Sequence, residues 1–331
     1  MVAEALGEPS LLAALVRLVD RIPLPAPPPE RRRGRPRVYP DRLFLKALVV
    51  MIVKRLPRVG TLLAVLDEPT PEVRRLRGLL TEDGRFPCRR TWERRLRAIP
   101  ATLPAQIGCL GRHLVAALDP WAAAGRAAAI DSTALQANGG VWHRKDREAG
   151  VVPHTSIDTE AHWTRSGWHG WVYGWKLHLV VTVAAVWLPL AADLTPANTA
   201  DNEHAPVLLP ALPPGLRFLF GDTSYDDPAL HARCAPAGLV LVPSRRGRRR
   251  THDPGREVRR VFHALRSRSI ENFNGQFKGI FDARRPVPTR GLAATRRWVL
   301  GAVLVYQLLL LHRFETGRPL RTGLKPCLLA A

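Results

Sequence analysis

Three acidic residues stand where carboxylates could act together on one phosphodiester. Asp131 follows the apolar run AAAI, Asp222 follows LRFLFG, and Glu271 lies in a segment with helical spacing. Carboxylates at the carboxyl ends of strands in an open α/β sheet face the same rim. Three carboxylates can hold two divalent ions about 3.5–4 Å apart, one activating the attacking oxygen and the other stabilising the leaving oxygen. We therefore expect a site for two Mg²⁺ ions, with Mn²⁺ as a substitute, at Asp131, Asp222 and Glu271.

The helix expected over residues 266–281 must position the last of these carboxylates. A single apolar stripe at steps of three and four is formed by Ile270, Phe273, Phe277 and Ile280. Glu271 is one position further round, at about 100°, and flanks the buried face. The alternative is an ordinary amphipathic surface helix whose charges are solvated.

From about residue 125 the pattern changes to short β-type runs separated by helix candidates. Strands are predicted at 127–131, 174–183, 186–194, 216–222 and 239–243. Strands first, then alternating helix and strand, then closing helices, is the order of a mixed sheet covered on both faces. The sequence thus predicts the α/β class and is compatible with a ribonuclease-H-like fold.

The N-terminal part is predicted to be helical and interrupted by a basic linker. The expected divisions are a helix at 1–21, a Pro/Arg-rich linker at 22–40, a helical DNA-binding region at 41–124, the sheet domain at 125–315 and a tail at 316–331.

Charge indicates a polyanionic partner. The chain has 50 Lys and Arg against 28 Asp and Glu, a formal net charge of +22. Such an excess favours nucleic acid, because each neutralised phosphate releases condensed counterions. The predicted DNA contacts are Arg33 and Arg35 in the linker, Arg90 and Arg94 on a basic helix, Arg245, Arg246 and Arg248 in the densest basic run, and Trp163 and Trp168 as stacking surfaces. For each of the arginines, a solvated surface position is the alternative.

Neither a membrane nor an oxidising compartment is indicated. The four cysteines are far apart and contain no CxxC pair, so a disulfide framework or zinc site is not predicted. The most apolar run, residues 298–311, is shorter than the roughly 20 residues needed to span a bilayer. We expect a buried helix there and a cytoplasmic protein.

Four segments, in order, resemble landmarks of the DDE transposase domain encoded by bacterial insertion sequences: IDSTAL, LTPANTADNEHAPVLL, FGDTSYDD and RSIENFNGQFK. The resemblance covers roughly residues 125–313. It implies a ribonuclease-H-like catalytic core, a metal-binding triad at Asp131, Asp222 and Glu271, and a DNA-contacting lysine at Lys278. Asp201 also recurs in the resemblance. We interpret it as a helix N-cap, and as the second choice for the middle carboxylate.

One part of the family signature is absent. Relatives carry a Tyr and an Arg seven and four residues before the glutamate, where this chain has Ala264 and Ser267. Either Arg266 or Arg268 could substitute for the arginine as a DNA contact, and the sequence leaves this open.

The resemblance implies a transposase that binds terminal inverted repeats and target DNA, acts as a homodimer on double-stranded DNA, and performs Mg²⁺-dependent strand cleavage and strand transfer. Two alternatives remain at this point. One is a catalytically inactive or domesticated DNA-binding relative, and the other is a nuclease on the same fold that lacks strand transfer.

Overall fold

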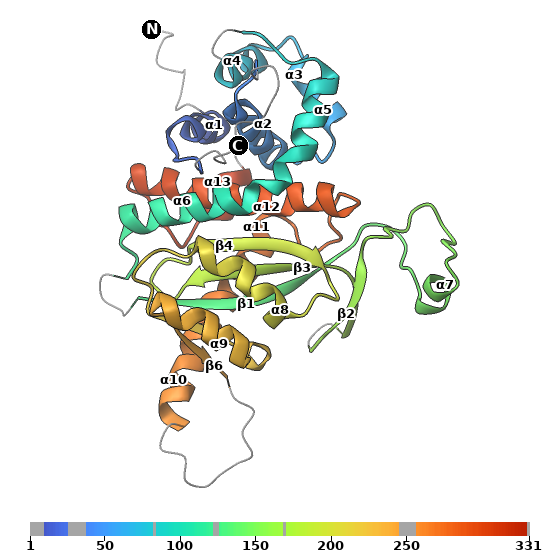
Figure 1. Cartoon of the computed structure of the whole chain (residues 1–331). Helices are drawn as coiled ribbons and strands as arrows, with labels where there is room; N and C mark the ends of the chain where they lie inside the picture. Colours follow the sequence, from blue (N-terminus) through green and yellow to red (C-terminus); the bar gives the residue numbers. More distant parts are fainter. Residues whose placement is uncertain are drawn as a thin grey trace.

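A computed structural model describes residues 10–25, 38–81, 84–121, 126–167, 170–244 and 256–329 of the chain. Within these ranges, a mixed sheet of six strands is flanked by helices, and further helices form the N-terminal region above it (Figure 1). The predicted α/β class, with a mixed sheet and an all-helical N-terminal region, is therefore confirmed for the described residues. The arrangement fits the ribonuclease-H-like fold.

The strands are β1 (Ala127–Gln136), β2 (His162–Ser166), β3 (Gly170–Thr182), β4 (Pro189–Pro196), β5 (Phe218–Gly221) and β6 (Val240–Pro243). β3 pairs antiparallel with β1, β2 and β4, whereas β1, β5 and β6 run parallel. Parallel strands need crossover connections, and helices α8 (Asp201–Leu208) and α9 (Pro228–Cys234) supply them.

Two strands differ from the prediction. The sequence does not predict β2, because its residues HWTRS lack an apolar alternation and it pairs only with the first part of β3. The first strand was expected to end at Asp131, but β1 continues to Gln136 because it stays paired with β3 along that length. Asp131 is therefore inside a strand rather than at its end. The parallel pairing of β1 with β5, however, is recorded only as far as Ala129.

Helices cover the sheet on both faces. α8 lies in front of the strands in Figure 1, and α11 (Asn272–Ile280) lies behind them. α6 (Leu103–Leu118) and α12 (Leu292–Glu315) pack against each other and against β4. α10 (Arg256–Arg266) contacts β5, and the short α13 (Leu324–Leu329) contacts α11.

The long helix α12 belongs to the core. By length and composition it could cross a membrane, yet 78% of its most apolar window is buried inside the fold. Its buried Gln307 donates hydrogen bonds to the carbonyls of Ile107 in α6 and Pro189 in β4, at 2.9 and 2.8 Å. These bonds satisfy the buried amide nitrogen, which would otherwise be costly to bury, whereas the amide oxygen has no partner among the described residues. The predicted buried helix over 298–311 is confirmed.

The N-terminal region consists of α1 (Leu11–Arg21), α2 (Asp41–Val53), α3 (Val59–Leu66), α4 (Pro71–Leu80) and α5 (Arg89–Ala98). Every residue of α2 from Leu43 to Val53 is buried. α2 packs on α1, α5 and α12, so the N-terminal helices and the sheet region share one hydrophobic core. The predicted domain boundaries remain predictions.

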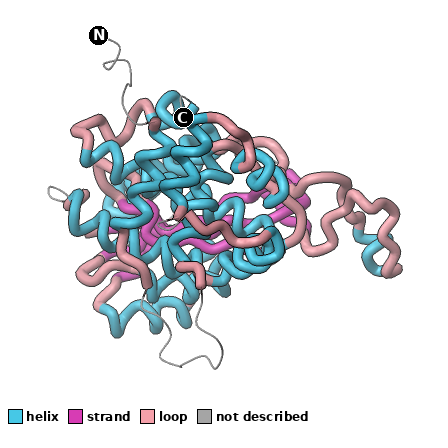
Figure 2. Tube along the Cα trace, turned by 90° about the horizontal axis from the view of Figure 1, so that it is seen from above, coloured by secondary structure: helices cyan, strands magenta, loops and turns pink. Residues whose placement is uncertain are grey.

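Residues 137–161, which we call the arm, connect β1 to β2 and project away from the sheet in both views (Figures 1 and 2). The arm carries the short helix α7 (Arg144–Glu148). Trp142 fixes its shape: its Nε1 donates to the carbonyl of Val151 at 2.8 Å, and the Arg147 guanidinium lies 4.8 Å from its ring centroid.

Candidate active site

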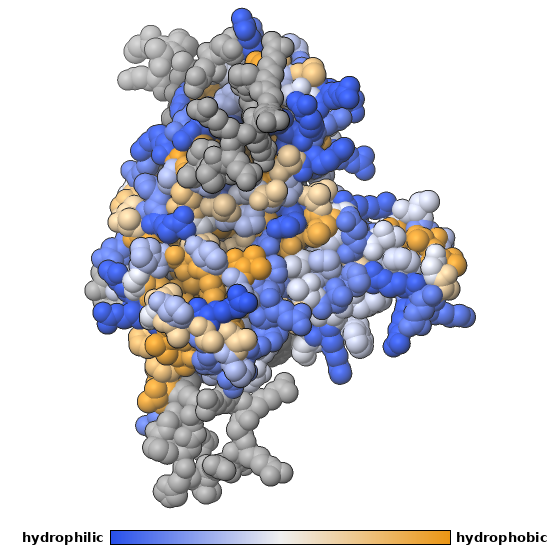
Figure 3. Space-filling view, in the orientation of Figure 1, coloured by the Kyte–Doolittle hydropathy of each residue, from blue (hydrophilic) through white to orange (hydrophobic). Residues whose placement is uncertain are grey.

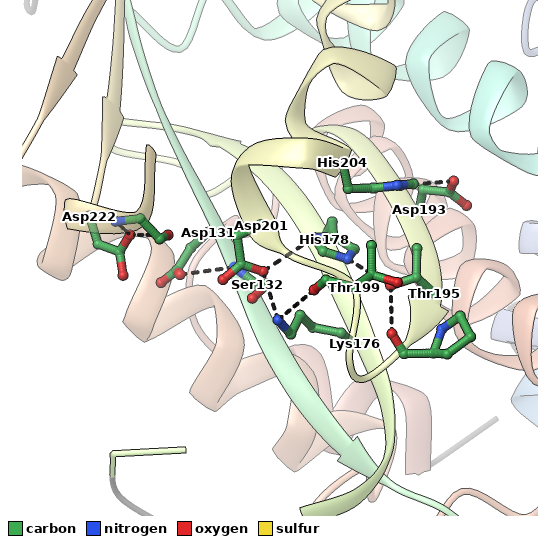
Figure 4. Close-up of polar contacts among 12 residues, drawn as sticks. Asp131, Ser132, Lys176, His178, Asp193, Thr195, Thr199, Asp201, His204 and Asp222 are labelled. Carbon is green, nitrogen blue, oxygen red and sulfur yellow. Dashed lines mark hydrogen bonds and ion pairs between the residues drawn. The ribbon is translucent and has the colours of Figure 1, made fainter. Parts of the chain in front are cut away.

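Two of the three predicted carboxylates lie close together, Asp131 on β1 and Asp222 directly after the neighbouring parallel strand β5 (Figure 4). β1 and β5 pair with Ala127 opposite Phe218 and Ala129 opposite Phe220. The same register, continued by two residues, places Asp131 opposite Asp222. Paired strands are about 4.8 Å apart, so the two carboxylates are neighbours at the rim of the sheet. Figure 4 shows them side by side.

The Asp131 carboxylate is held in place by two donors. The Ser132 amide donates to Oδ1 at 2.8 Å, and Arg266 donates to Oδ2 at 3.2 Å. The pKa of Asp131 is raised to about 6, chiefly because the carboxylate is buried; Arg266 and the Ser132 amide oppose the shift, and the charges of Asp222 and Asp201 add to it. Burial penalises the charged form, so an ion or a cationic partner is favoured beside it.

Asp222 follows β5 directly and caps a short 3₁₀ turn, Thr223–Tyr225. The amide and hydroxyl of Ser224 both donate to its Oδ1. Among the described residues, no donor contacts its Oδ2. One carboxylate oxygen is thus used to fix the side chain, and the other is available to a ligand.

Glu271 ends a π-helical turn, Ser267–Glu271, inserted between α10 and α11. Two side chains bond back to carbonyls four residues earlier: Ser269 Oγ to Leu265 O at 3.0 Å, and Asn272 Nδ2 to Arg268 O at 2.6 Å. Such bonds are known to bend helices locally, and single π-helical turns are frequent at functional sites. The Glu271 side chain is 61% exposed, and its Oε1 lies 3.8 Å from the guanidinium of Arg266.

Arg266 connects the first and last carboxylates. Its guanidinium is 3.2 Å from Asp131 and 3.8 Å from Glu271, and its side chain is only 9% exposed. Its Nε is buried and has no hydrogen-bond partner among the residues that the structure describes. Arg268, in contrast, is exposed. Of the two arginines left open by the sequence, Arg266 is the one that lies among the carboxylates, whereas its predicted role in binding DNA remains a prediction.

Sequence reasoning missed a second polar group beside the aspartates, built on β3 and α8 (Figure 4). Asp201 is the first residue of α8 and not its N-cap, which is Ala200, so the N-cap interpretation was wrong. Lys176 Nζ lies 3.1 Å from Asp201 Oδ1, an ion pair by distance rather than a directed hydrogen bond, and also donates to the carbonyl of Thr199 at 2.8 Å. Asp201 is thus a fourth carboxylate near Asp131, neutralised by a lysine. Polar residues at alternate positions of a buried strand, Lys176 and His178, were the available signal.

His178 gives this polar group a pH dependence. The pKa of His178 is lowered to about 3, chiefly because the ring is buried; His204 and Lys176 contribute to the shift, and Asp193 opposes it. Its neutral ring bonds Thr195 Oγ1 at 2.9 Å. A folded-state pKa below the unfolded value of 6.5 contributes stability that is complete above the unfolded pKa and is lost as pH falls towards the folded one.

We therefore expect acid to weaken the fold through His178. From neutral pH to about pH 5, this residue should remove about 2 kcal/mol of unfolding free energy, and His178→Gln should abolish that part of the pH dependence. Urea unfolding at several pH values measures it, with the exposed His113→Gln as the control. An identical pH slope in wild type and His178→Gln would contradict the prediction.

The predicted DNA contacts fall into three groups. Arg33, Arg35, Arg245, Arg246, Arg248 and Trp168 lie outside the described residues. Arg90 and Arg94 are exposed on α5, opposite the buried Trp92 and Leu96. Lys278 and Trp163 are half-buried and already bonded, Lys278 Nζ to the Ala134 carbonyl at 3.2 Å and Trp163 Nε1 to the Trp142 carbonyl at 2.9 Å. The role of each in binding DNA remains a prediction.

The carboxylates have the right chemistry for a hard divalent cation, which prefers oxygen ligands. The guanidinium of Arg266 lies between Asp131 and Glu271, so this part of the site already holds a positive charge. Within the described ranges, no three His, Cys, Asp or Glu side chains come close enough to hold a metal ion as they stand. The three carboxylates therefore fit the ion by donor type, whereas the described structure does not gather them around one point.

Comparison with known proteins identifies the family. The model of the family described as "Transposase DDE domain" matches residues 123–308, more than half of the chain. No curated protein and no solved structure matches the chain. The match spans β1 to β6, the π-helical turn and most of α12, and so contains Asp131, Asp222 and Glu271. This match covers the mixed sheet and the acidic residues at its rim. It shows that the chain belongs to the DDE-domain transposase family, whose members act on DNA and generally use divalent metal ions.

Proposed function

We propose that this protein is an insertion-sequence transposase that binds terminal inverted repeats and catalyses metal-dependent DNA strand cleavage and strand transfer. The observation that supports it most directly is the register of β1 and β5, which sets Asp131 and Asp222 side by side, with Arg266 joining Asp131 to Glu271. We assign Asp131, Asp222 and Glu271 as ligands of two Mg²⁺ ions, for which Mn²⁺ can substitute.

The three proposed metal ligands differ in their state before a metal ion binds. Asp131 is ionised above about pH 6, so its carboxylate is ready to bind a cation at neutral pH. Asp222, fixed through Oδ1, presents its second oxygen to the same rim. Glu271 is exposed and completes the set by turning from solvent towards the sheet. When bound, the metal ions activate the attacking oxygen and stabilise the leaving one.

Arg266 has two positions in this scheme. In the free protein it neutralises Asp131 and Glu271. On DNA, its guanidinium moves from the carboxylates to the scissile phosphate, for which its planar fork of donors is suited. Arg266 then supplies the positive group that the family signature provides one residue later, at the position of Ser267.

Recognition of DNA ends is assigned to the basic N-terminal helices. Arg90 and Arg94 project from α5, whose other side is anchored in the core by Trp92 and Leu96. Two element ends must be processed together, so we propose a homodimer assembled on DNA.

A pre-nicked donor duplex tests strand transfer directly. With Mg²⁺ and a target plasmid, the exposed 3′-hydroxyl should be joined to target DNA, giving a longer labelled strand on a denaturing gel. Hydrolysis of phosphodiesters without a joined product would identify a nuclease on the same fold. Binding without either reaction would identify an inactive DNA-binding relative.

A further inference from the structure

A groove of about 1190 Å³ lies between the N-terminal helices and the sheet region, away from the carboxylates. One wall is formed by the start of α3 and by α5, and includes Arg58 and Arg97. The other wall is formed by the arm and the segment before α12, and includes Gly139 and Arg290. The first turns of α12 lie at its base, with Arg297. In Figure 3 the α5 region is largely hydrophilic, and a small apolar patch lies between it and the base of the arm.

The groove carries an excess of positive charge. Its arginines are Arg58, Arg89, Arg97, Arg290 and Arg297, and its carboxylates are Glu93 and Glu160. Both carboxylates are occupied: Glu93 pairs with Arg89 at 2.8 Å, and Glu160 Oε2 accepts from the Leu292 amide at 2.9 Å. Within the described ranges, no carboxylate is at ion-pair distance from any of the other four arginines. Four cationic groups are thus left to an external anion.

The arginines are also close enough to affect one another. Burial, and then the charge of Arg97, lowers the pKa of Arg297. Among the described residues, Arg297 donates only to backbone carbonyls, those of Leu96 at 3.4 Å and Pro57 at 3.5 Å. Like charges gathered without a counter-ion repel one another, so a bound polyanion would relieve the repulsion.

The shape of the groove suits a sugar–phosphate backbone. Small residues line both walls and the base: Gly60, Gly139, Gly291, Ala293 and Ala294. Gly139 and Gly291 are packed against Ser156 and Glu160 of the chain itself, whereas Gly60 has open space beside it apart from the Arg89 side chain at 3.9 Å. Arg89 and Arg97 are eight residues apart on α5 and share one side of that helix with Glu93, whereas Arg90 and Arg94 lie on the neighbouring side. The groove therefore uses a side of α5 that the sequence did not single out.

We propose that this groove holds the backbone of duplex DNA about seven base pairs from the scissile phosphate. The distance follows from β1, which carries Asp131 and leads into Asn138 and Gly139 at the groove. Seven residues of extended chain span about 23 Å, and DNA rises about 3.4 Å per base pair. The assignment rests on the proposed function, because the distance is measured from the proposed catalytic carboxylates.

The test uses full-length protein and two double variants of equal charge. Arg97→Ala with Arg290→Ala removes one arginine from each wall of the groove. Arg233→Ala with Arg318→Ala removes two exposed arginines elsewhere. Fluorescence anisotropy of a labelled duplex at several salt concentrations gives the affinity and the slope of log K against log salt. For a long duplex, the groove variant should lose about two units of slope and at least about tenfold in affinity at physiological salt, while the control loses little.

Duplex length supplies the second comparison. A duplex with only about five base pairs on each side of the scissile phosphate would not reach the groove, so both double variants should bind it equally. Equal losses by the two variants on the long duplex would overturn the proposal. The proposal would also be overturned if the groove variant lost the same affinity and salt slope on long and short duplexes. The groove would then bind DNA phosphates at any distance from the scissile phosphate.

Folding is checked separately. Arg290 donates to the Thr155 carbonyl at 2.9 Å, so thermal unfolding of the double variant is compared with wild type. Arg58→Ala removes a groove arginine for which the structure shows no side-chain hydrogen bond, and should lower the slope by about one unit; an unchanged slope would count against the groove. Failure of the transposase proposal would appear instead as absent strand transfer with the groove's length-dependent binding intact.

Discussion

Asp131→Asn, Asp222→Asn and Glu271→Gln are each expected to reduce metal-dependent cleavage of element-end DNA by about a thousandfold or more, with DNA binding nearly unchanged. Each substitution removes a carboxylate charge but preserves the size of the side chain. Stabilisation of the transition state by bound metal is worth several kcal/mol, and 1.36 kcal/mol corresponds to about tenfold in rate. Cleavage of a labelled duplex in Mg²⁺ measures the first quantity, and anisotropy of the same duplex measures the second.

Asp226→Asn is the matched control, since it removes a carboxylate only four residues after Asp222 in the same loop. It should cut at close to the wild-type rate. Wild-type cutting by any of the three triad variants would remove that residue from the site. Loss of cutting in Asp201→Asn together with normal cutting in Asp222→Asn would transfer the middle position to Asp201.

Phe273→Ala should have the largest effect on stability. Phe273 is fully buried, and its ring is 5.1 Å from Tyr306 of α12 and 5.7 Å from Phe277. Removing a buried aromatic ring costs about 3–5 kcal/mol, because the lost contacts leave a cavity. Cleavage should fall as well, since Phe273 anchors the helix two residues after Glu271. Urea unfolding and the cleavage assay measure the two effects.

Phe281→Ala is the control at the end of the same helix. Phe281 is partly exposed, and its ring contacts only Phe277 among the aromatic residues described, at 5.1 Å. Its loss should cost clearly less than the loss of Phe273. Equal destabilisation by the two substitutions would mean that Phe273 does not anchor this helix to α12.

Much of the fold follows from periodicity. The apolar stripe Ile270, Phe273, Phe277 and Ile280 was predicted from steps of three and four, and all four residues are buried. β2 could not be predicted, because it is held by pairing with β3 rather than by an apolar pattern of its own. The extension of β1 beyond Asp131 likewise depends on a partner distant in sequence.

Less of the site could be predicted, and the arginine shows why. The sequence could not decide between Arg266 and Arg268. Each residue is turned by about 100° from the next around a helix, so a local change in winding decides which of the two arginines faces the sheet. A π-helical turn inserts one extra residue and changes which side chain faces the sheet. That turn is associated with local bonds from Ser269 and Asn272, which leave no trace in an apolar pattern. Lys176 and His178 belong to strand β3, and only the folded sheet brings them near Asp201.

The shared core of the N-terminal helices and the sheet region has a consequence for how a cut is placed on DNA. Because α2 is buried against α12, the basic helices and the carboxylates belong to one rigid frame rather than to two modules on a tether. The basic helices that bind DNA and the carboxylates that cut it then keep a constant angular relation around the axis of the duplex. Inserting one base pair between them would turn the duplex by about 34° on that frame. The helices and the carboxylates are also a fixed distance apart, so cutting at the original phosphate should be lost on insertion and should not recover at a full turn, which adds about 34 Å of DNA. A flexibly linked enzyme would still cut there.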